Sequence, residues 1–212
     1  MPNTPTPPET GWWHCLAVAP DGSRRWFAVV ASSRHPDAAR VELLEEAARH
    51  EIGTDAVCVA RYDEHERVCG LDLPIPTVPP LWFGELRESA AQPPAVNLVA
   101  FTGHGVAPGA LHDDAALRDL PVASGDQLGA VRWYPATGEL DQIYVQPNWR
   151  RRGLATALIA AAATLSYARD WPRLWSDGQR TELGERLRNS GPWWHRAAEL
   201  THLAPPMTPP GD

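Results

Sequence analysis

The stretch IYVQPNWRRRGLATAL, residues 143–158, combines the end of a strand, a turn and the start of a helix. The β-rich run closes at Val145, because the proline two residues later cannot continue a central ladder. Three consecutive arginines, Arg150–Arg152, then precede Gly153. From Gly153 to Ala168 apolar side chains recur at helical spacing, the strongest helix pattern in the chain.

This turn has the chemistry of an anion site. The amides in the first turn of a helix lack intrahelical acceptors, and the helix dipole adds partial positive charge there. Gly153 allows a ligand to approach the backbone, and the arginines add positive charge. The pattern therefore predicts a pyrophosphate as the ligand. The alternative is an arginine-rich turn that only solvates the helix start. Neither G-x-x-x-x-G-K-[S/T] nor G-x-G-x-x-G occurs, which excludes a P-loop and a dinucleotide fingerprint.

The same run resembles motif A of the GNAT superfamily of N-acetyltransferases, in which a strand ending in V-x-P is followed by Q/R-x-x-G-x-G/A. Val145-Gln146-Pro147 supplies the first part, and Arg150 to Ala155 supply the second. The expected order of hairpin, helix, strand and helix also fits, and the resemblance covers about residues 97–194. It implies acetyl-CoA as cosubstrate, transfer of the acetyl group to an amine in a ternary complex, and no metal.

The resemblance also implies which residues hold acetyl-CoA. The backbone of Tyr144 and Val145 would bond the pantetheine arm, and the amides from Arg151 to Thr156 would hold the pyrophosphate. The full set of cofactor-binding residues implied in this way is Tyr144, Val145, Arg150, Arg151, Arg152, Gly153, Leu154, Ala155 and Thr156.

Two acidic residues on the strand before the turn are candidates for the catalytic base. Strand alternation predicts that Glu139, Asp141, Ile143 and Val145 share one face. Glu139 stands where the histone-acetyltransferase branch of the superfamily carries its glutamate, six residues before the closing aliphatic residue. Asp141 is the other candidate, acting directly or through water. The alternative for Glu139 is a solvated residue beside the hairpin turn.

The chain departs from the family pattern at the leaving-group acid. The usual tyrosine lies on the helix after the next strand, but that helix, residues 181–189, has none near Leu187 and Arg188. Water, Tyr144 or Tyr167 would then protonate the thiolate. A second hypothesis follows: a catalytically weak or inactive GNAT-fold module that binds CoA or a protein partner.

The predicted fold class is α+β, with a GNAT-like mixed β-sheet flanked by helices. Residues 1–10 and 204–212 are proline-rich and predicted to be disordered tails. Between them we expect an N-terminal α/β arm or subdomain at 11–95 and the acetyl-CoA-binding domain at 96–203.

Within the first part, strands are expected at Leu16–Ala19, Arg25–Ala31 and Ala56–Tyr62. A helix is expected to open at Pro36 and end before Gly53, with its apolar positions at Val41, Leu44, Ala48 and Ile52. Residues 71–95 are expected to form an irregular proline-rich connector whose Leu81-Trp82-Phe83 cluster packs back on the core. In the second part, strands are expected at Asn97–Phe101, Gln127–Tyr134, Leu140–Val145 and Arg173–Ser176, and helices at 153–168 and 181–189.

Composition restricts the remaining function classes. The net charge of -7 argues against a general nucleic-acid binder and is compatible with a cationic amine acceptor, a small molecule or a protein amine. No apolar run reaches membrane-spanning length, and the N-terminus lacks a secretory pattern, so a cytoplasmic monomer or homodimer is expected. Three cysteines form no CxxC pair, and His65 and Cys69 lack a second pair at zinc spacing, so no metal is expected.

Overall fold

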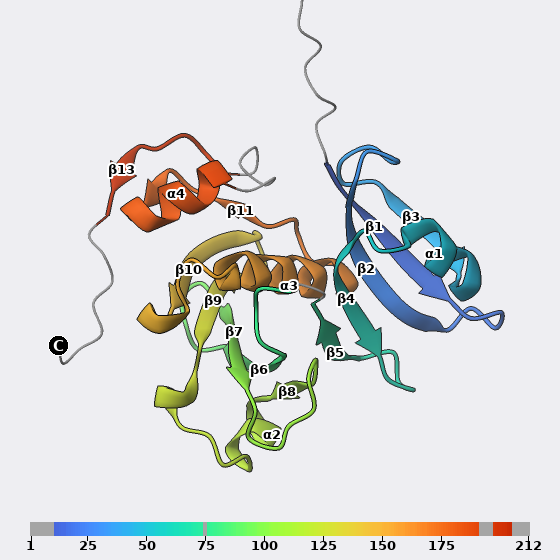
Figure 1. Cartoon of the computed structure of the whole chain (residues 1–212), viewed down its shortest axis with the longest axis horizontal. Coiled ribbons are helices and arrows are strands. Elements are labelled where there is room, and N and C mark those ends of the chain that lie inside the picture. Colours follow the sequence, from blue (N-terminus) through green and yellow to red (C-terminus); the bar gives the residue numbers. More distant parts are fainter. Residues whose placement is uncertain (1–10, 74–75, 191–196, 205–212) are drawn as a thin grey trace, which may run out of the picture.

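The computed structural model describes residues 11–73, 76–190 and 197–204. Its described residues form two large β-sheets and one two-stranded sheet, and one long helix, α3 (Leu154–Ala168), packs between the two large sheets (Figure 1). This arrangement confirms the predicted α+β class with mixed sheets flanked by helices. Both predicted tails fall outside the described residues except for Ala204.

The N-terminal sheet has five strands in the order β3-β1-β2-β4-β5. Alternate residues of β1 face opposite sides: Trp12 and Leu16 pack toward α3, while Trp13 and Cys15 pack toward helix α1. Burial on both sides explains why these strands are apolar almost throughout. The elements are β1 (Gly11–Val18), β2 (Arg24–Ser32), β3 (Arg40–Leu44), α1 (Glu45–Ile52), β4 (Ala56–Tyr62) and β5 (Val68–Asp72).

The second sheet has six strands in the order β11-β10-β9-β7-β6-β8, with α3 on one face and α2 on the other. Its elements are β6 (Leu81–Glu88), β7 (Ala95–Thr102), β8 (Leu111–Asp113), α2 (Asp114–Arg118), β9 (Gly129–Tyr134), β10 (Glu139–Val145) and β11 (Trp175–Ser176). Short 3₁₀ turns cover Ser124–Asp126 and Pro147–Trp149. Strands β12 (Gln179–Arg180) and β13 (His202–Leu203) pair with each other beside α4 (Glu182–Ser190).

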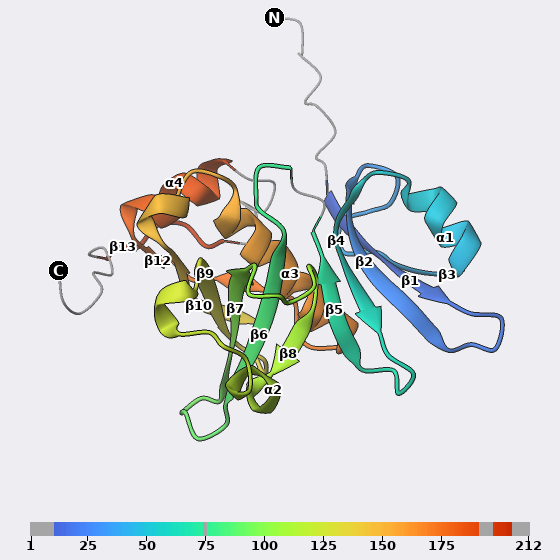
Figure 2. The ribbon, with the colours of Figure 1, turned by 60° about the horizontal axis from the view of Figure 1, so that its bottom comes forward.

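The two sheets meet along β5 and β8 (Figure 2). Leu71 of β5 donates its amide to the carbonyl of Gly109, 2.7 Å away, and Gly70 forms a bridge with Ala110. One apolar cluster includes Phe27 and Leu71 from the first sheet together with Val131 from the second. The two parts therefore share a core, and the division at residue 95 stays a prediction.

Helix α3 is apolar on nearly every side because both sheets pack against it. Alanines at 160–163 are all buried, and their small side chains let the backbone of the helix approach both sheets. The buried hydroxyl of Thr164 donates to the carbonyl of Ala160 at 2.8 Å, which satisfies it inside this apolar layer. The predicted helix at residues 153–168 is confirmed, with Gly153 at its N-cap.

The helix expected to open at Pro36 was wrong in its first half. Residues 40–44 form strand β3, parallel to β1, and the helix starts only at Glu45. Val41 and Leu43 alternate inward, whereas Leu44 is 56% exposed. The apolar positions fitted both the helical and the strand period. Pairing with β1 determines that residues 40–44 form a strand. Gly53 ends the helix, as expected.

The irregular connector expected at residues 71–95 was also wrong. Residues 81–88 form β6, which pairs antiparallel with β7 and parallel with β8 in the six-stranded sheet. The prolines lie on either side of this run, so they bound the strand without interrupting its ladder. Leu81, Trp82 and Phe83 are buried, which confirms that this cluster packs on the core.

The strand expected at Leu16–Ala19 starts five residues earlier, as β1. The other predicted elements are found with small shifts of their ends, and β4 matches residue for residue. The strand expected at 173–176 is reduced to Trp175–Ser176. Strand β8 and helix α2 were not predicted. Asp113 caps α2 by accepting a hydrogen bond from the amide of Ala116 at 2.9 Å, a local signal that a search for N-caps would have found.

Candidate functional site

Strand β10 is paired along its whole length on one side only. It is antiparallel to β9 from Glu139 to Val145, whereas only Glu139 and Leu140 pair with β11. Beyond Leu140 the β11 side of β10 meets no other strand among the described residues. This free edge runs from residue 141 to residue 145 and ends at the arginine-rich turn.

A β-bulge interrupts β10 at Asp141. Leu140 pairs with Trp133 and Gln142 pairs with Arg132, so Asp141 is the extra residue. Leu140 packs toward α3 together with Ile143 and Val145. Glu139 and Asp141 instead lie on the opposite face, so the prediction that they share a face with Ile143 and Val145 was wrong. The bulge reverses the alternation.

The turn between β10 and α3 presents unpaired amides. The first amide bonded within the helix is that of Ala157, which donates to the carbonyl of Gly153 at 2.9 Å. The amides from Arg151 to Thr156 have no acceptor among the described residues, and no side chain caps α3. Gly153 has φ 85° and Arg151 has φ 62°, so two left-handed residues shape this turn.

The arginine side chains have different surroundings. Arg150 donates from Nε to the carbonyl of Val145 at 3.1 Å, which ties the turn to the end of β10. The guanidinium of Arg152 lies over the ring of Trp149, 5.0 Å from its centroid. Arg151 is exposed, and no partner for its side chain occurs in the described chain. The turn therefore offers unpaired amides and exposed positive charge at one place.

A polar cluster occupies the sheet face opposite α3, beside the bulge. We call Glu88, Asn97, Arg132, Tyr134 and Asp141 the polar cluster. Arg132 bonds Asp141 and also Glu88, the latter at 2.8 Å. The hydroxyl of Tyr134 donates to Oδ1 of Asp141 at 2.9 Å, and Asn97 donates to Glu88 at 2.6 Å.

These contacts set the charge states within the polar cluster. The hydrogen bond from Arg132, with a second from Asn97, holds the pKa of Glu88 below its ordinary value. Hydrogen bonds to Glu88 and Asp141 raise the pKa of Arg132, which stays charged. Arg132, Tyr134 and Glu88 were missed from sequence. Arg132 and Tyr134 are two residues apart on β9, directly before the hairpin, and so share one sheet face. This spacing was the signal from which a polar face could have been predicted.

Glu139 differs from Asp141 in its surroundings. It pairs in register with Tyr134 and therefore lies on the same sheet face, but its carboxylate makes no hydrogen bond or ion pair within the described ranges. Both oxygens of Asp141 are engaged, one by Arg132 and the other by Tyr134. Of the two predicted acids, Glu139 is the one with free oxygens.

The two tyrosines considered as proton donors have different positions. Tyr144 pairs with Ala130 and so lies on the face opposite α3, on the free part of β10. Tyr167 lies thirteen residues after Leu154, about 20 Å along α3, and packs against His14 with ring centroids 3.8 Å apart. Tyr167 therefore lies near the end of α3 that is far from the arginine-rich turn, against the N-terminal sheet.

Helix α4 carries an ion-pair network where the family's tyrosine is expected. Glu185 bonds Arg180 at 2.9 Å and Arg188 at 3.2 Å. These hydrogen bonds, with Arg180 first, lower the pKa of Glu185. Thr181 accepts a hydrogen bond from the amide of Gly184 at 3.1 Å and so caps the helix. These residues stabilise α4 and offer no proton donor of the tyrosine type.

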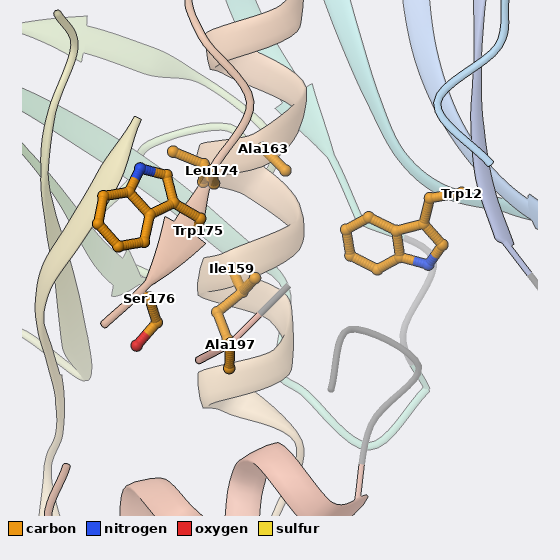
Figure 3. A pocket seen from close by; sticks show the side chains of 7 residues that line it. All are labelled: Trp12, Ile159, Ala163, Leu174, Trp175, Ser176 and Ala197. Atoms are coloured by element: carbon orange, nitrogen blue, oxygen red, sulfur yellow. The ribbon is translucent and has the colours of Figure 1, made fainter. Parts of the chain in front are cut away.

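A small pocket beside α3 is too narrow for a substrate. Figure 3 shows Trp12 and Trp175 on opposite sides of the helix, with Ile159 and Ala163 between them. The cavity measures about 40 Å³, room for a few water molecules. Its lining is almost entirely apolar, so it is a packing defect between elements and not part of the candidate site.

Comparison with known proteins agrees with this geometry. Residues 99–184 match the model of the acetyltransferase (GNAT) family, a range that runs from β7 through the arginine-rich turn into α4. The chain therefore contains a domain of the GNAT acetyltransferase family, which supports acetyltransferase activity in general. No curated protein and no solved structure was found to match the chain.

No group of three or more His, Cys, Asp or Glu side chains is placed to hold a metal ion in the part of the chain that the structure describes. None of the helices within the described ranges is long and apolar enough to span a membrane.

Proposed function

We propose that the protein transfers an acetyl group from acetyl-CoA to an amine by direct attack in a ternary complex. One observation carries the proposal: six successive amides, Arg151 to Thr156, find no acceptor within the described ranges at the start of α3, directly after the free edge of β10. A pyrophosphate and a peptide-like arm are the chemical groups that such a pair of features would bind together.

The residues present fit acetyl-CoA. The amides of the turn would hold the pyrophosphate, with Arg150–Arg152 supplying charge and Gly153 leaving room for the phosphate oxygens. The pantetheine arm carries amide groups, and it would bond the backbone of Tyr144 and Val145 as an added strand would. The thioester would then lie farther back along the free edge, toward the bulge at Asp141.

The transfer step needs three groups at the bulge. The amine nitrogen attacks the thioester carbonyl carbon, the carbon–sulfur bond breaks, and the thiolate takes a proton. An amide freed from the ladder by the bulge would donate to the carbonyl oxygen as negative charge develops on it. A carboxylate would accept the proton of the ammonium, and a hydroxyl or water would protonate the thiolate.

The surroundings of the acids suggest different roles for them. The carboxylate of Glu139 has no partner among the described residues, so Glu139 is the better proton acceptor of the two. Asp141 is held by Arg132 and Tyr134 and would fix the arrangement of these side chains on the sheet face. Tyr144 lies on the free part of β10, along the proposed path of the pantetheine arm. We propose it, or a water molecule beside it, as the proton donor.

The second candidate function is a GNAT-fold module that binds CoA without catalysis. The ion-pair network of Glu185 with Arg180 and Arg188, at the place of the family's tyrosine, favours it. The two functions make the same prediction for CoA binding and opposite predictions for turnover.

Calorimetry with CoA and acetyl-CoA, followed by a thiol-release assay against a panel of amines, separates them. An acetyltransferase binds both ligands and releases one thiol for each acetylated amine. Binding without any release above the spontaneous rate across the panel indicates the non-catalytic module. Absence of binding contradicts both.

A further inference from the structure

The sheet face opposite α3 contains a second cavity that the transfer chemistry does not use. It measures about 230 Å³. Its floor is formed by Leu86 of β6 and by Val99 and Phe101 of β7, and Leu117 of α2 and Val122 line its sides. Polar atoms occur mainly at the rim, where Asp114 and Arg118 neutralise each other in an ion pair. The cavity is therefore an apolar chamber with a neutral rim.

Strand register connects this cavity to the free edge of β10. Leu86, Asn97, Arg132 and Gln142 lie opposite one another on successive strands and share one face. In the neighbouring row Val99, on the cavity floor, is opposite Ala130, which is opposite Tyr144. Strands are spaced by about 4.8 Å, so the floor at β7 lies about 10 Å from β10. The small side chain of Ala130 lies along the direct path.

The two ends of this path differ in charge. At the β10 end, two carboxylates, Asp141 and Glu139, share the face with one guanidinium, that of Arg132, which also pairs with Glu88 of β6. This excess of negative charge favours an ammonium group. The cavity at the other end has an apolar floor and favours an uncharged apolar group.

We propose that the cavity holds the apolar end of the acetyl acceptor, which is a primary amine carrying an aromatic or branched aliphatic group about 10 Å or more from its nitrogen, because Asp141 and Glu139 lie farther along β10 than Tyr144 does. The proposal rests on the proposed function, because it assigns the β10 end to the reacting amine. The volume suffices, since an apolar cavity of about 150 Å³ binds benzene. An acceptor with a second charge at its far end would leave that charge in apolar surroundings and is excluded from the cavity.

The experiment compares three amines that share a four-carbon chain: 4-phenylbutylamine, n-butylamine and 1,4-diaminobutane. Dissociation constants are measured by calorimetry or ligand-observed NMR with the full chain, with and without CoA. We expect 4-phenylbutylamine to bind more tightly than either other amine by about tenfold or more, from burial of its ring.

Two tryptophan variants locate the binding. Ala123 is exposed and lines the cavity, so A123W fills it from the rim while the backbone amide of residue 123 keeps its bond to Asp126. Ala115 is exposed on α2 and does not line the cavity, so A115W is the matched control. We expect A123W to bring the affinity ratio of the two monoamines close to one and A115W to keep the wild-type ratio.

Equal affinities for the three amines, or a preference that A123W keeps, would overturn the proposal. Its failure is distinguishable from failure of the proposed function. A ring preference that A123W removes, without acetyl transfer, retains the cavity assignment and rejects the transferase. Acetyl transfer to all three amines at similar kcat/KM, with similar affinities, retains the transferase and rejects the cavity assignment.

Discussion

The hydroxyl of Tyr134 donates a hydrogen bond to Oδ1 of Asp141 over 2.9 Å, while Arg132 bonds the other oxygen of the same carboxylate. Asp141 is thereby fixed from two sides by the neighbouring strand β9. Glu139, two residues earlier and on the same face, has no such partner among the described residues. The two acids of β10 are therefore not equivalent, which gives the first prediction its direction.

We expect Glu139→Gln to lower kcat by about 10²–10⁴-fold, the usual contribution of a general base, with the affinity for CoA retained. Asp141→Asn keeps the shape and the hydrogen bond from Tyr134 and should lower kcat by less than Glu139→Gln. Turnover is measured on an amine that the wild type acetylates, across pH. If Glu139 is the base, Glu139→Gln loses the acidic limb of the pH–rate profile and Asp141→Asn keeps it. The reverse pattern would assign the base to Asp141, and full turnover by the double variant would exclude both.

The second prediction concerns the turn at the start of α3. Gly153→Asp places a carboxylate and a side chain where the unpaired amides meet, at a residue with φ 85°. We expect calorimetry to detect no CoA binding, because negative charge repels the pyrophosphate at the site where it would be held.

The matched control is Gly105→Asp, at an exposed loop glycine with φ 72° and no atoms within 4 Å of an added Cβ. It imposes similar backbone strain away from the turn and should leave CoA affinity near the wild-type value. Wild-type affinity in Gly153→Asp would disprove the assignment of the pyrophosphate to this turn.

Sequence patterns predicted the elements around the turn well and the polar surroundings of the acids poorly. The turn was found because proline, three arginines and a glycine mark it locally. The sheet face on which Glu139 and Asp141 lie was not predicted correctly. Strict alternation assumes an unbroken strand, whereas the bulge at Asp141 arises from pairing with β9. Bulges of this kind are set by a partner strand and leave no mark in the bulged strand itself.

The missed strand β6 has a similar cause. Local composition around residues 71–95 is rich in proline, but the eight residues of β6 contain none, and pairing with β7 and β8 determines their conformation. The cavity under α2 was beyond prediction as well. It forms where Leu86 and Val99 meet a segment from residues 114–127, and that contact depends on the order of strands in the sheet.

The third prediction tests how closely α3 must approach the sheet. A Cβ on Gly129 would lie 2.7 Å from the carbonyl oxygen of Tyr144 and 3.0 Å from Cδ1 of Leu158. Gly129→Ala should therefore displace β10 or α3 and destabilise the fold by about 1–3 kcal/mol, the usual cost of overpacking. For a chain of this size, that corresponds to a decrease in Tm of roughly 2–12 °C, measured by calorimetry or circular dichroism.

Gly125→Ala is the control for this change, because nothing lies within 4 Å of its added Cβ. It should leave Tm nearly unchanged. Because Gly129 lies against both β10 and α3, Gly129→Ala should also weaken CoA binding when the protein is still folded. A normal Tm together with normal CoA affinity would show that the helix does not depend on this close approach.

The fourth prediction concerns Glu85 of β6 and Arg169 at the end of α3, which form two hydrogen bonds of 2.7 and 2.5 Å. Burial by itself would raise the pKa of Glu85, but hydrogen bonds from Arg169 and Arg87 outweigh it, and the pKa lies below its ordinary value.

The contribution of this ion pair to the stability of the wild type is therefore present above the unfolded pKa of glutamate, about 4.3, and is lost as pH falls through the lowered pKa. Arg169→Met removes the main partner of a carboxylate that is 5% exposed and leaves it with Arg87 alone, so it should cost somewhat less near pH 7 than the about 3–5 kcal/mol of a buried charge with no partner. Since protonation removes the charge that Arg169 no longer compensates, the deficit measured by urea unfolding should shrink from pH 7 toward pH 4. Glu85→Gln combined with Arg169→Met should recover much of the stability. A deficit independent of pH would mean that Arg169 acts through packing and not through this ion pair.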